Sequence, residues 1–195
     1  MKIYGLTGSI GMGKSSTTRL LRQLRVHSFS SDEAVHELLS PKGRAFETVA
    51  LLFPEAWDKK NHVINRQILG EIIFKDAQKR QVLEGVLHPL VVWSQREFIN
   101  RARRMGLKKI VLDIPLLFET GAQARVDKTI SVTAPYFLQR ARVLRRPHFT
   151  PEKFDKILKQ QMPDRVKRLL SDKIIHTGLG RAFVMQQLKQ FLRKG

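Results

Sequence analysis

The stretch that decides the fold lies near the N-terminus and reads Gly8-Ser9-Ile10-Gly11-Met12-Gly13-Lys14-Ser15. It matches the pattern G-x-x-x-x-G-K-[ST] at every fixed position, with a predicted strand at 2–7 before it and a helical pattern from Lys14 onward. Glycines let the backbone wrap closely around phosphate, Lys14 reaches the outer phosphates, and the Ser15 hydroxyl can bind Mg²⁺. The stretch therefore predicts a nucleoside triphosphate site rather than a flexible turn with a surface lysine.

Further strands are predicted along the chain, and helical segments alternate with them. The strand segments are 26–30, 110–113, 128–133 and 173–176. A turn signal and a helical stretch follow each of the last three. This alternation predicts an α/β fold with a parallel sheet.

The region from about residue 40 to 106 is predicted to be mainly helical, with no strong strand. Helical segments at 43–53, 65–75 and 78–104 are separated by the loop 54–61, and His88-Pro89 predicts a break in the last segment. We expect this region to be an insertion at one edge of the sheet.

Composition limits the class of protein. The chain has 195 residues, 42% of them hydrophobic, which is enough for a core and argues against disordered, collagen-like or repeat proteins. It has no cysteine, which excludes disulfides and thiolate metal sites. No apolar stretch approaches the roughly 18 residues of a membrane span, and the polar residues of the glycine-rich stretch come too early for a signal peptide. We expect a soluble, unprocessed cytoplasmic protein.

The most unusual property of the chain is its formal net charge, which is +19 at pH 7. Residues 101–195 hold 22 of the 36 basic residues and only 7 of the 17 acidic residues, so the excess is C-terminal. A balance this basic indicates an anionic partner, a phosphate site, or a solvated basic surface. Composition does not choose among them.

Three carboxylates are candidates for phosphate chemistry. Asp32 follows the strand at 26–30, and if that strand lies beside the first one, its side chain projects over the same edge as the glycine-rich stretch. Asp32 could then accept a proton from a hydroxyl substrate, or it could only cap the helix beginning at Glu33. Asp113 ends an apolar strand in the manner of a Walker B acid, and Glu119 follows it; the alternative is a buried carboxylate hydrogen-bonded to loop amides.

Four arginines crowd one predicted helix just before Pro147; they are Arg140, Arg142, Arg145 and Arg146. Their mutual repulsion needs water, acids or phosphates to relieve it. One interpretation is a solvated face. The other is a mobile lid that brings arginines onto phosphate oxygens.

These residues together resemble the dephospho-CoA kinase family of P-loop enzymes, nearly from end to end. Beyond the phosphate stretch, the specific matches include His88-Pro-Leu-Val91 and Leu112-Asp-Ile-Pro-Leu-Leu-Phe-Glu119. Further matching pieces are Ser31-Asp-Glu-Ala-Val-His36, Asn65-Arg-Gln-Ile-Leu69, Gln139-Arg-Ala-Arg-Val-Leu-Arg-Arg146, Gln161-Met-Pro163 and Asp172-Lys-Ile-Ile-His-Thr-Gly178.

The resemblance implies ATP- and Mg²⁺-dependent phosphorylation of the ribose 3′-hydroxyl of dephospho-CoA, the last step of CoA synthesis. It implies a three-layer P-loop fold in one kinase domain, 1–195, with a five-stranded parallel sheet. Residues 1–39 and 107–195 would form the core, about 138–162 a lid, and 40–106 the helical insertion that binds the acceptor.

The resemblance also assigns residues to roles. The ATP phosphates would be held by Gly11, Met12, Gly13, Lys14, Ser15 and Ser16, and adenine by Thr177 and Gly178. Asp32 would be the base, Arg142 and Arg146 lid arginines acting with Lys14 in catalysis, and Ser15 and Asp113 the residues facing the metal. Asp32, Arg66, His88 and Leu116 would face the acceptor.

The sequence departs from the family pattern at three places. The usual Asp-Ala-Asp after the second strand reads Ser30-Ser31-Asp32, so the first acid is missing while the expected base is present. Ser16 replaces a threonine and keeps the hydroxyl. His176-Thr177 replaces the frequent Asp-Asn near the adenine.

Two other functions compete with this one. The first is a kinase for another nucleoside or nucleotide hydroxyl. The second is a nucleic-acid-binding ATPase, which the charge favours. The aromatic residues of the basic half form no stacking series, and no nucleic-acid module is recognisable, so we expect dephospho-CoA and ATP as partners, with neither nucleic acid nor membrane.

Overall fold

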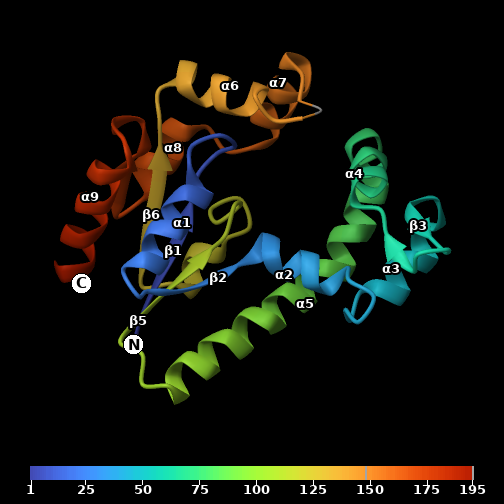
Figure 1. Cartoon of the computed structure of the whole chain (residues 1–195), viewed down its shortest axis with the longest axis horizontal. Coiled ribbons are helices and arrows are strands. Elements are labelled where there is room, and N and C mark those ends of the chain that lie inside the picture. Colours follow the sequence, from blue (N-terminus) through green and yellow to red (C-terminus); the bar gives the residue numbers. More distant parts are fainter. Residues whose placement is uncertain (148, 195) are drawn as a thin grey trace. The chain divides into compact units, whose positions relative to one another are not determined.

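The computed structural model describes residues 1–147 and 149–194 (Figure 1). The chain forms two compact units, one made of Met1–Phe29 with Ala102–Gly195 and the other of Ser30–Arg101. We call them the sheet unit and the helical unit. The helical unit begins at Ser30, earlier than the insertion expected from the sequence, and it therefore includes the segment that carries Asp32.

The sheet has five strands in the order β2-β5-β1-β6-β7, which confirms the predicted parallel architecture. The strands are β1 (Lys2–Thr7), β2 (His27–Ser30), β5 (Lys109–Asp113), β6 (Lys128–Thr133) and β7 (Lys173–His176). The condition under which Asp32 was placed near the phosphate stretch, a second strand directly beside the first, is not met, because β5 lies between them. Crossovers between parallel strands allow this order, and local patterns carry no information about it.

The core of the sheet unit forms where β1 and β6 pack against helices α1 (Lys14–Gln23) and α9 (Arg181–Lys194). Leu6 and Ile130 are fully buried, and Leu21 of α1 and Leu188 of α9 join them in one apolar cluster. The strands therefore read as continuous apolar runs, as buried parallel strands do. This packing fixes the loop between β1 and α1, which is the phosphate stretch.

The remaining elements of the sheet unit follow β5, β6 and β7. They are η2 (Ala122–Arg125), α6 (Tyr136–Leu144), α7 (Pro151–Gln160), α8 (Asp164–Leu170) and η3 (Thr177–Leu179). Residues 115–121 form turns, so the helical stretch expected after β5 is only the short 3₁₀ helix η2. Helices α6 and α7 lie beyond the carboxyl end of β6 (Figure 1).

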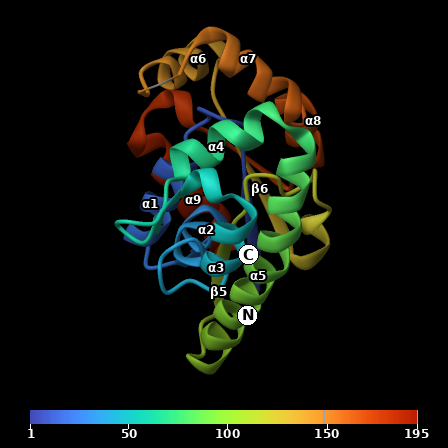
Figure 2. The same cartoon turned by 90° about the vertical axis from the view of Figure 1, so that its right-hand side faces the viewer.

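The helical unit contains α2 (Ser31–Leu38), α3 (Phe46–Leu52), η1 (Pro54–Ala56), α4 (Arg66–Lys75) and most of α5 (Ala77–Arg104), which can be followed in Figure 2. Its core gathers Phe46, Phe53, Leu69 and Leu83. The expected loop at 54–61 instead holds η1 and the first strand of a short antiparallel pair, β3 (Trp57–Asp58) with β4 (Val63–Ile64).

The break expected at His88-Pro89 is wrong, because α5 continues through Pro89. A proline removes one hydrogen bond and crowds the preceding turn. Leu83 and Leu87 before it are buried in the core of the helical unit, and Leu90 and Val91 after it pack against the same core. Burial on both sides of the proline keeps the helix continuous.

Candidate active site

The phosphate stretch has the backbone that its glycines were expected to allow. Gly11 and Gly13 have φ values of 76° and 92°, in the region that favours glycine. A Cβ atom at Gly11 would lie 2.6 Å from Val143 Cγ2, and one at Gly13 would lie 2.9 Å from Thr177 Oγ1. Gly13 is the N-cap of α1 and has no side chain that could cap the helix, so the first N–H groups of α1 are placed for an anion.

Lys14 and Asp113 meet at the end of the stretch. Lys14 Nζ donates to Asp113 Oδ1 at 2.6 Å, and Thr18 Oγ1 donates to Asp113 Oδ2 at 2.8 Å. Asp113 is 3% exposed, so its carboxylate needs both partners. Both of these partners are side chains of α1.

The loop after β7 is tied to the phosphate stretch through Thr177. Thr177 Oγ1 donates to the Met12 carbonyl oxygen at 2.7 Å, and Arg142 donates to Thr177 Oγ1 at 3.0 Å and to the Thr177 carbonyl oxygen at 2.9 Å. Sequence reasoning assigned Thr177 to adenine and Arg142 to phosphate. Here the Thr177 hydroxyl supports the Met12 backbone, and the Arg142 guanidinium supports Thr177.

Two glutamines that the sequence analysis left without a role hold the backbone of Ile10. Gln139 Nε2 donates to the Ile10 carbonyl oxygen at 2.8 Å, and the Ile10 N–H donates to Gln161 Oε1 at 3.0 Å. Gln139 belongs to α6, and Gln161 follows α7. Gln139 and Gln161 are the first residues of two pieces that match the family pattern. The match therefore singled them out, but it did not indicate what they contact.

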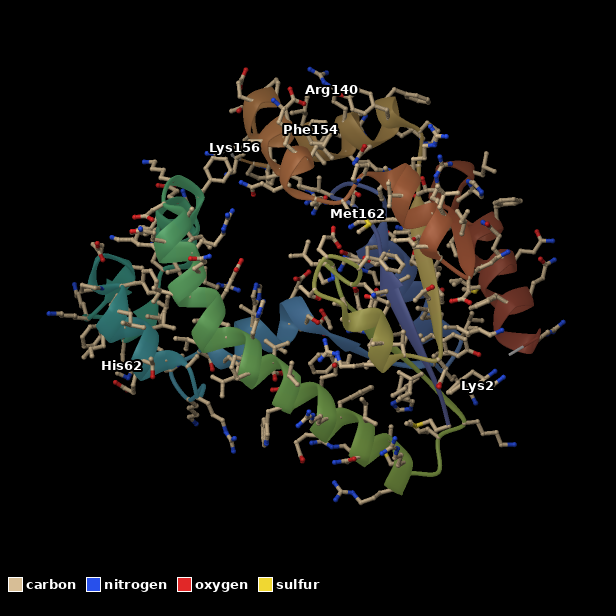
Figure 3. The ribbon with its side chains drawn as sticks, turned by 180° about the vertical axis from the view of Figure 1, so that it is seen from behind. Lys2, His62, Arg140, Phe154, Lys156 and Met162 are labelled. Carbon is tan, nitrogen blue, oxygen red and sulfur yellow. The ribbon has the colours of Figure 1, made fainter. Side chains whose placement is uncertain are left out.

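Glu119 and Lys167 form a buried pair beneath the end of α7. Lys167 Nζ lies 2.8 Å from Glu119 Oε1, and the Met162 N–H (residue labelled in Figure 3) donates to the same oxygen at 2.9 Å. The residue Lys167 is fully buried. Burial raises the pKa of Glu119, but hydrogen bonds from Lys167 and backbone N–H groups, with the Lys167 charge, outweigh it and leave the pKa below 4.5.

The other predicted residues of the sheet unit lie in α1, in the segment after α6, and in the turns after β5 and β7. Ser15 and Ser16 begin α1 and are exposed, and Gly178 is half-buried. Arg146 is exposed and lies 5.8 Å from the ring centroid of Phe149. Leu116 is 37% exposed in the turns after β5.

The predicted acceptor residues Asp32, Arg66 and His88 belong to the helical unit, together with Ser30. Asp32 lies in the first turn of α2, Arg66 begins α4, and His88 is inside α5. The interpretation of Asp32 as the helix cap is wrong: the N-cap is Ser30, whose Oγ accepts from the Glu33 N–H at 3.2 Å. Ser30, which replaces the usual first acid, therefore caps α2, and Asp32 does not.

Two properties concern metals and membranes. Across residues 1–147 and 149–194, no three His, Cys, Asp or Glu side chains gather in a way that could hold a metal ion. Asp113 contacts Lys14, and Ser15 is the next residue along the phosphate stretch; one carboxylate and one hydroxyl suit Mg²⁺ only when phosphates complete the ligand set. Within the same described residues, none of the helices has the length and apolar character needed to cross a membrane.

Comparisons with known proteins extend over nearly the whole chain. Residues 2–180 match the family model of dephospho-CoA kinase. A dephospho-CoA kinase from Mesorhizobium japonicum is 47% identical over 180 residues, which are 92% of this chain and 89% of that protein. The solved dephospho-CoA kinase from Campylobacter jejuni has a TM-score of 0.72 at 27% identity and covers 100% of this chain and 97% of its own. The Thermus thermophilus protein TT1252 has a TM-score of 0.82 at 30% identity, with 99% and 97% covered.

Proposed function

The chain belongs to the dephospho-CoA kinase family, and we propose that it transfers the γ-phosphoryl group of ATP to the ribose 3′-hydroxyl of dephospho-CoA. The products are CoA and ADP. The observation that carries the proposal is the match of residues 2–180 to this one family, because it includes both the phosphate stretch and the pieces expected to face the acceptor. ATP as the donor favours the cytoplasm as the compartment.

The phosphates of ATP are bound by the backbone and side chains of residues 11–16. The positive φ values of Gly11 and Gly13 support this role, because they turn the backbone around the space in which an anion meets the start of α1. Thr177 and the two glutamines hold Met12 and Ile10, so the loop is organised before the nucleotide arrives. A preorganised loop loses less entropy on binding.

Lys14 has two alternative partners. Its ammonium now contacts Asp113 at 2.6 Å, and on ATP binding it reaches the outer phosphates, whose charge outweighs that of one carboxylate. Asp113 and the Ser15 hydroxyl would then hold Mg²⁺ with phosphate oxygens, since Mg²⁺ commonly takes one or two carboxylates plus substrate phosphates. When bound, Mg²⁺ neutralises charge that develops on the transferring group.

The acceptor hydroxyl is activated by Asp32. Its oxygen attacks the γ-phosphorus, the bond from that phosphorus to the β–γ bridging oxygen breaks, and the hydroxyl proton passes to the Asp32 carboxylate. The position of Asp32 in the first turn of α2, just after the end of β2, supports this role, and Ser30 rather than Asp32 is the N-cap of that helix. Arg66, His88 and Leu116 contact the acceptor and orient it.

Residues 138–162 act as the lid, and Arg142 and Arg146 neutralise the transferring phosphoryl group. Arg146 is exposed, so its guanidinium is available to a phosphate. Arg142 exchanges Thr177 for phosphate oxygens, or acts from Thr177 as a positioning residue. Thr177 and Gly178 meet adenine through their backbone, since the Thr177 hydroxyl is used by Met12.

A direct assay tests the proposal. The purified chain is incubated with Mg²⁺, ATP and dephospho-CoA, and CoA and ADP are measured by chromatography. We expect equal amounts of both products, with adenosine and AMP as much poorer acceptors. No CoA above a protein-free control would overturn the proposal, and faster turnover of adenosine or AMP would assign the chain to another hydroxyl acceptor.

A further inference from the structure

A concave site lies at the end of the sheet unit opposite the phosphate stretch. It has a volume of about 460 Å³, which falls within the range of about 300–1,000 Å³ typical of small-molecule sites. It is formed where β2 and β5 begin, by the ends of α1 and α9 and the turn before β5. Lys2, labelled in Figure 3, marks this end of the sheet, because its N–H donates to the Lys108 carbonyl oxygen at 2.8 Å.

Positive charge dominates the lining of this pocket, which we call the basal pocket. Six of its ten lining residues are basic, namely Arg25, His27, Lys108, Lys109, Lys189 and Arg193. The other four are three leucines and one valine, so none of these ten residues is acidic. Like charges converging on one hollow repel each other unless an anion or water relieves them.

The floor of the basal pocket is held in place by its own residues. Lys109 Nζ donates to the carbonyl oxygen of Leu192 at 2.6 Å, which ties the start of β5 to the last turn of α9. Leu192 and Val26 are buried in the core of the sheet unit. A rigid apolar floor with cations around it suits a ligand that has both an apolar or planar part and negative charge.

Helix dipoles explain only part of this charge. The cations near the ends of α1 and α9 interact favourably with the negative ends of these helices. Lys108 and His27 belong to neither helix, yet both line the same hollow. Arg25 has a φ of 56°, a conformation at the end of α1 that favours glycine, so the chain places a large cation where a residue without a side chain fits better.

We propose that the basal pocket binds a phosphorylated small molecule of nucleotide size. Its phosphates contact Lys108, Lys189 and Arg193, and its apolar or planar part lies on the leucines of the floor. The proposal is independent of the reaction at the phosphate stretch, because no residue of that stretch lines the pocket. It also gives a use to C-terminal charge that ATP and dephospho-CoA do not explain.

The test is isothermal titration of the full chain at low salt, with ADP and inorganic tripolyphosphate as probes. Because both probes also bind the phosphate stretch, the chain is titrated as such and with Lys14→Met. We expect two sites in the unaltered chain, and one site to persist with Lys14→Met. Adding Lys189→Glu and Arg193→Glu should weaken that persisting site at least about tenfold, and raised salt should weaken it too.

The matched control reverses two exposed lysines that do not line the basal pocket, Lys42→Glu with Lys60→Glu, and should leave the second site unchanged. If the charge reversals at Lys189 and Arg193 disturb folding, Lys189→Gln with Arg193→Gln replaces them. A single site for both probes, or a second site that weakens equally in the control, overturns the proposal. Binding of a single-stranded oligonucleotide through Lys189 and Arg193 without binding of either probe overturns it as well.

Discussion

Replacement of Lys167 by methionine tests whether the buried pair with Glu119 holds the end of α7 in place. Lys167 is fully buried, and its Nζ lies 2.8 Å from Glu119 Oε1. Methionine at position 167 has nearly the same length as lysine and no charge, so Glu119 keeps backbone N–H groups, including that of Met162, but loses the ammonium. Removing one partner of a buried ion pair commonly costs about 3–5 kcal/mol.

The cost for Lys167→Met should fall at the low end of that range, at about 3 kcal/mol. The Met162 N–H still donates to Glu119 Oε1, so the carboxylate that loses the ammonium keeps a hydrogen bond. Glu119→Gln should lower the free energy of unfolding by more, about 4 kcal/mol, because it removes the charged partner of Lys167, whose side chain is only 1% exposed. The double variant leaves no uncompensated charge and should recover at least about 2 kcal/mol relative to the sum of the single variants.

Urea unfolding at pH 7, followed by circular dichroism, measures these free energies of unfolding. The pH dependence gives a second measurement. Because the pKa of Glu119 is lowered by folding, its contribution to stability is present above about pH 4.5 and is lost as pH falls through the folded value. Lys167→Met should flatten this part of the acid profile. Single variants that each cost less than about 1 kcal/mol, or an additive double variant, would refute the reasoning.

Other predictions concern turnover and nucleotide binding. Asp32→Asn should bind ATP normally and lose at least about 100-fold in kcat, whereas Glu33→Gln in the same turn should not; a near-normal rate for Asp32→Asn would place the base elsewhere. Thr177→Val removes the hydrogen bond to Met12 and should cost about 1–2 kcal/mol in urea unfolding and raise the KM for ATP; unchanged values would mean that the loop does not need this support. Gln161→Ala leaves the Ile10 N–H without its acceptor and should raise the KM for ATP more than it lowers kcat, and the opposite pattern would contradict a positioning role.

The local helix signals around Ser30 show how far sequence reasoning reaches. Ser30 and Glu33 have the spacing of a capping box, in which a serine accepts from the N–H three residues later. The sequence therefore contained the evidence that Ser30, not Asp32, is the N-cap of α2. Pro89 is the opposite case, because the local rule predicts a break and distant core contacts of Leu83 and Leu87 override it.

Local sequence rules could not predict which side chains hold the backbone of the phosphate stretch. Gln139 and Gln161 are 129 and 151 residues away from Ile10 along the chain, and no periodicity connects them. The pairing of Glu119 with Lys167 is hidden in the same way. Side chains at these separations meet only because parallel strands bring their carboxyl ends to one edge of the sheet.

The sequence by itself determined the phosphate stretch, the alternation of strands and helices, and the family, because each depends on residue types at fixed local spacing. Only the tertiary structure decided that β5 lies between β1 and β2, which side chains hold Ile10 and Met12, and which basic residues line the basal pocket. Strand order and side-chain contacts follow from packing between segments far apart in the chain. The physical reason is that removing surface from water stabilises any contact of the right shape and chemistry, however far apart its residues lie in the sequence.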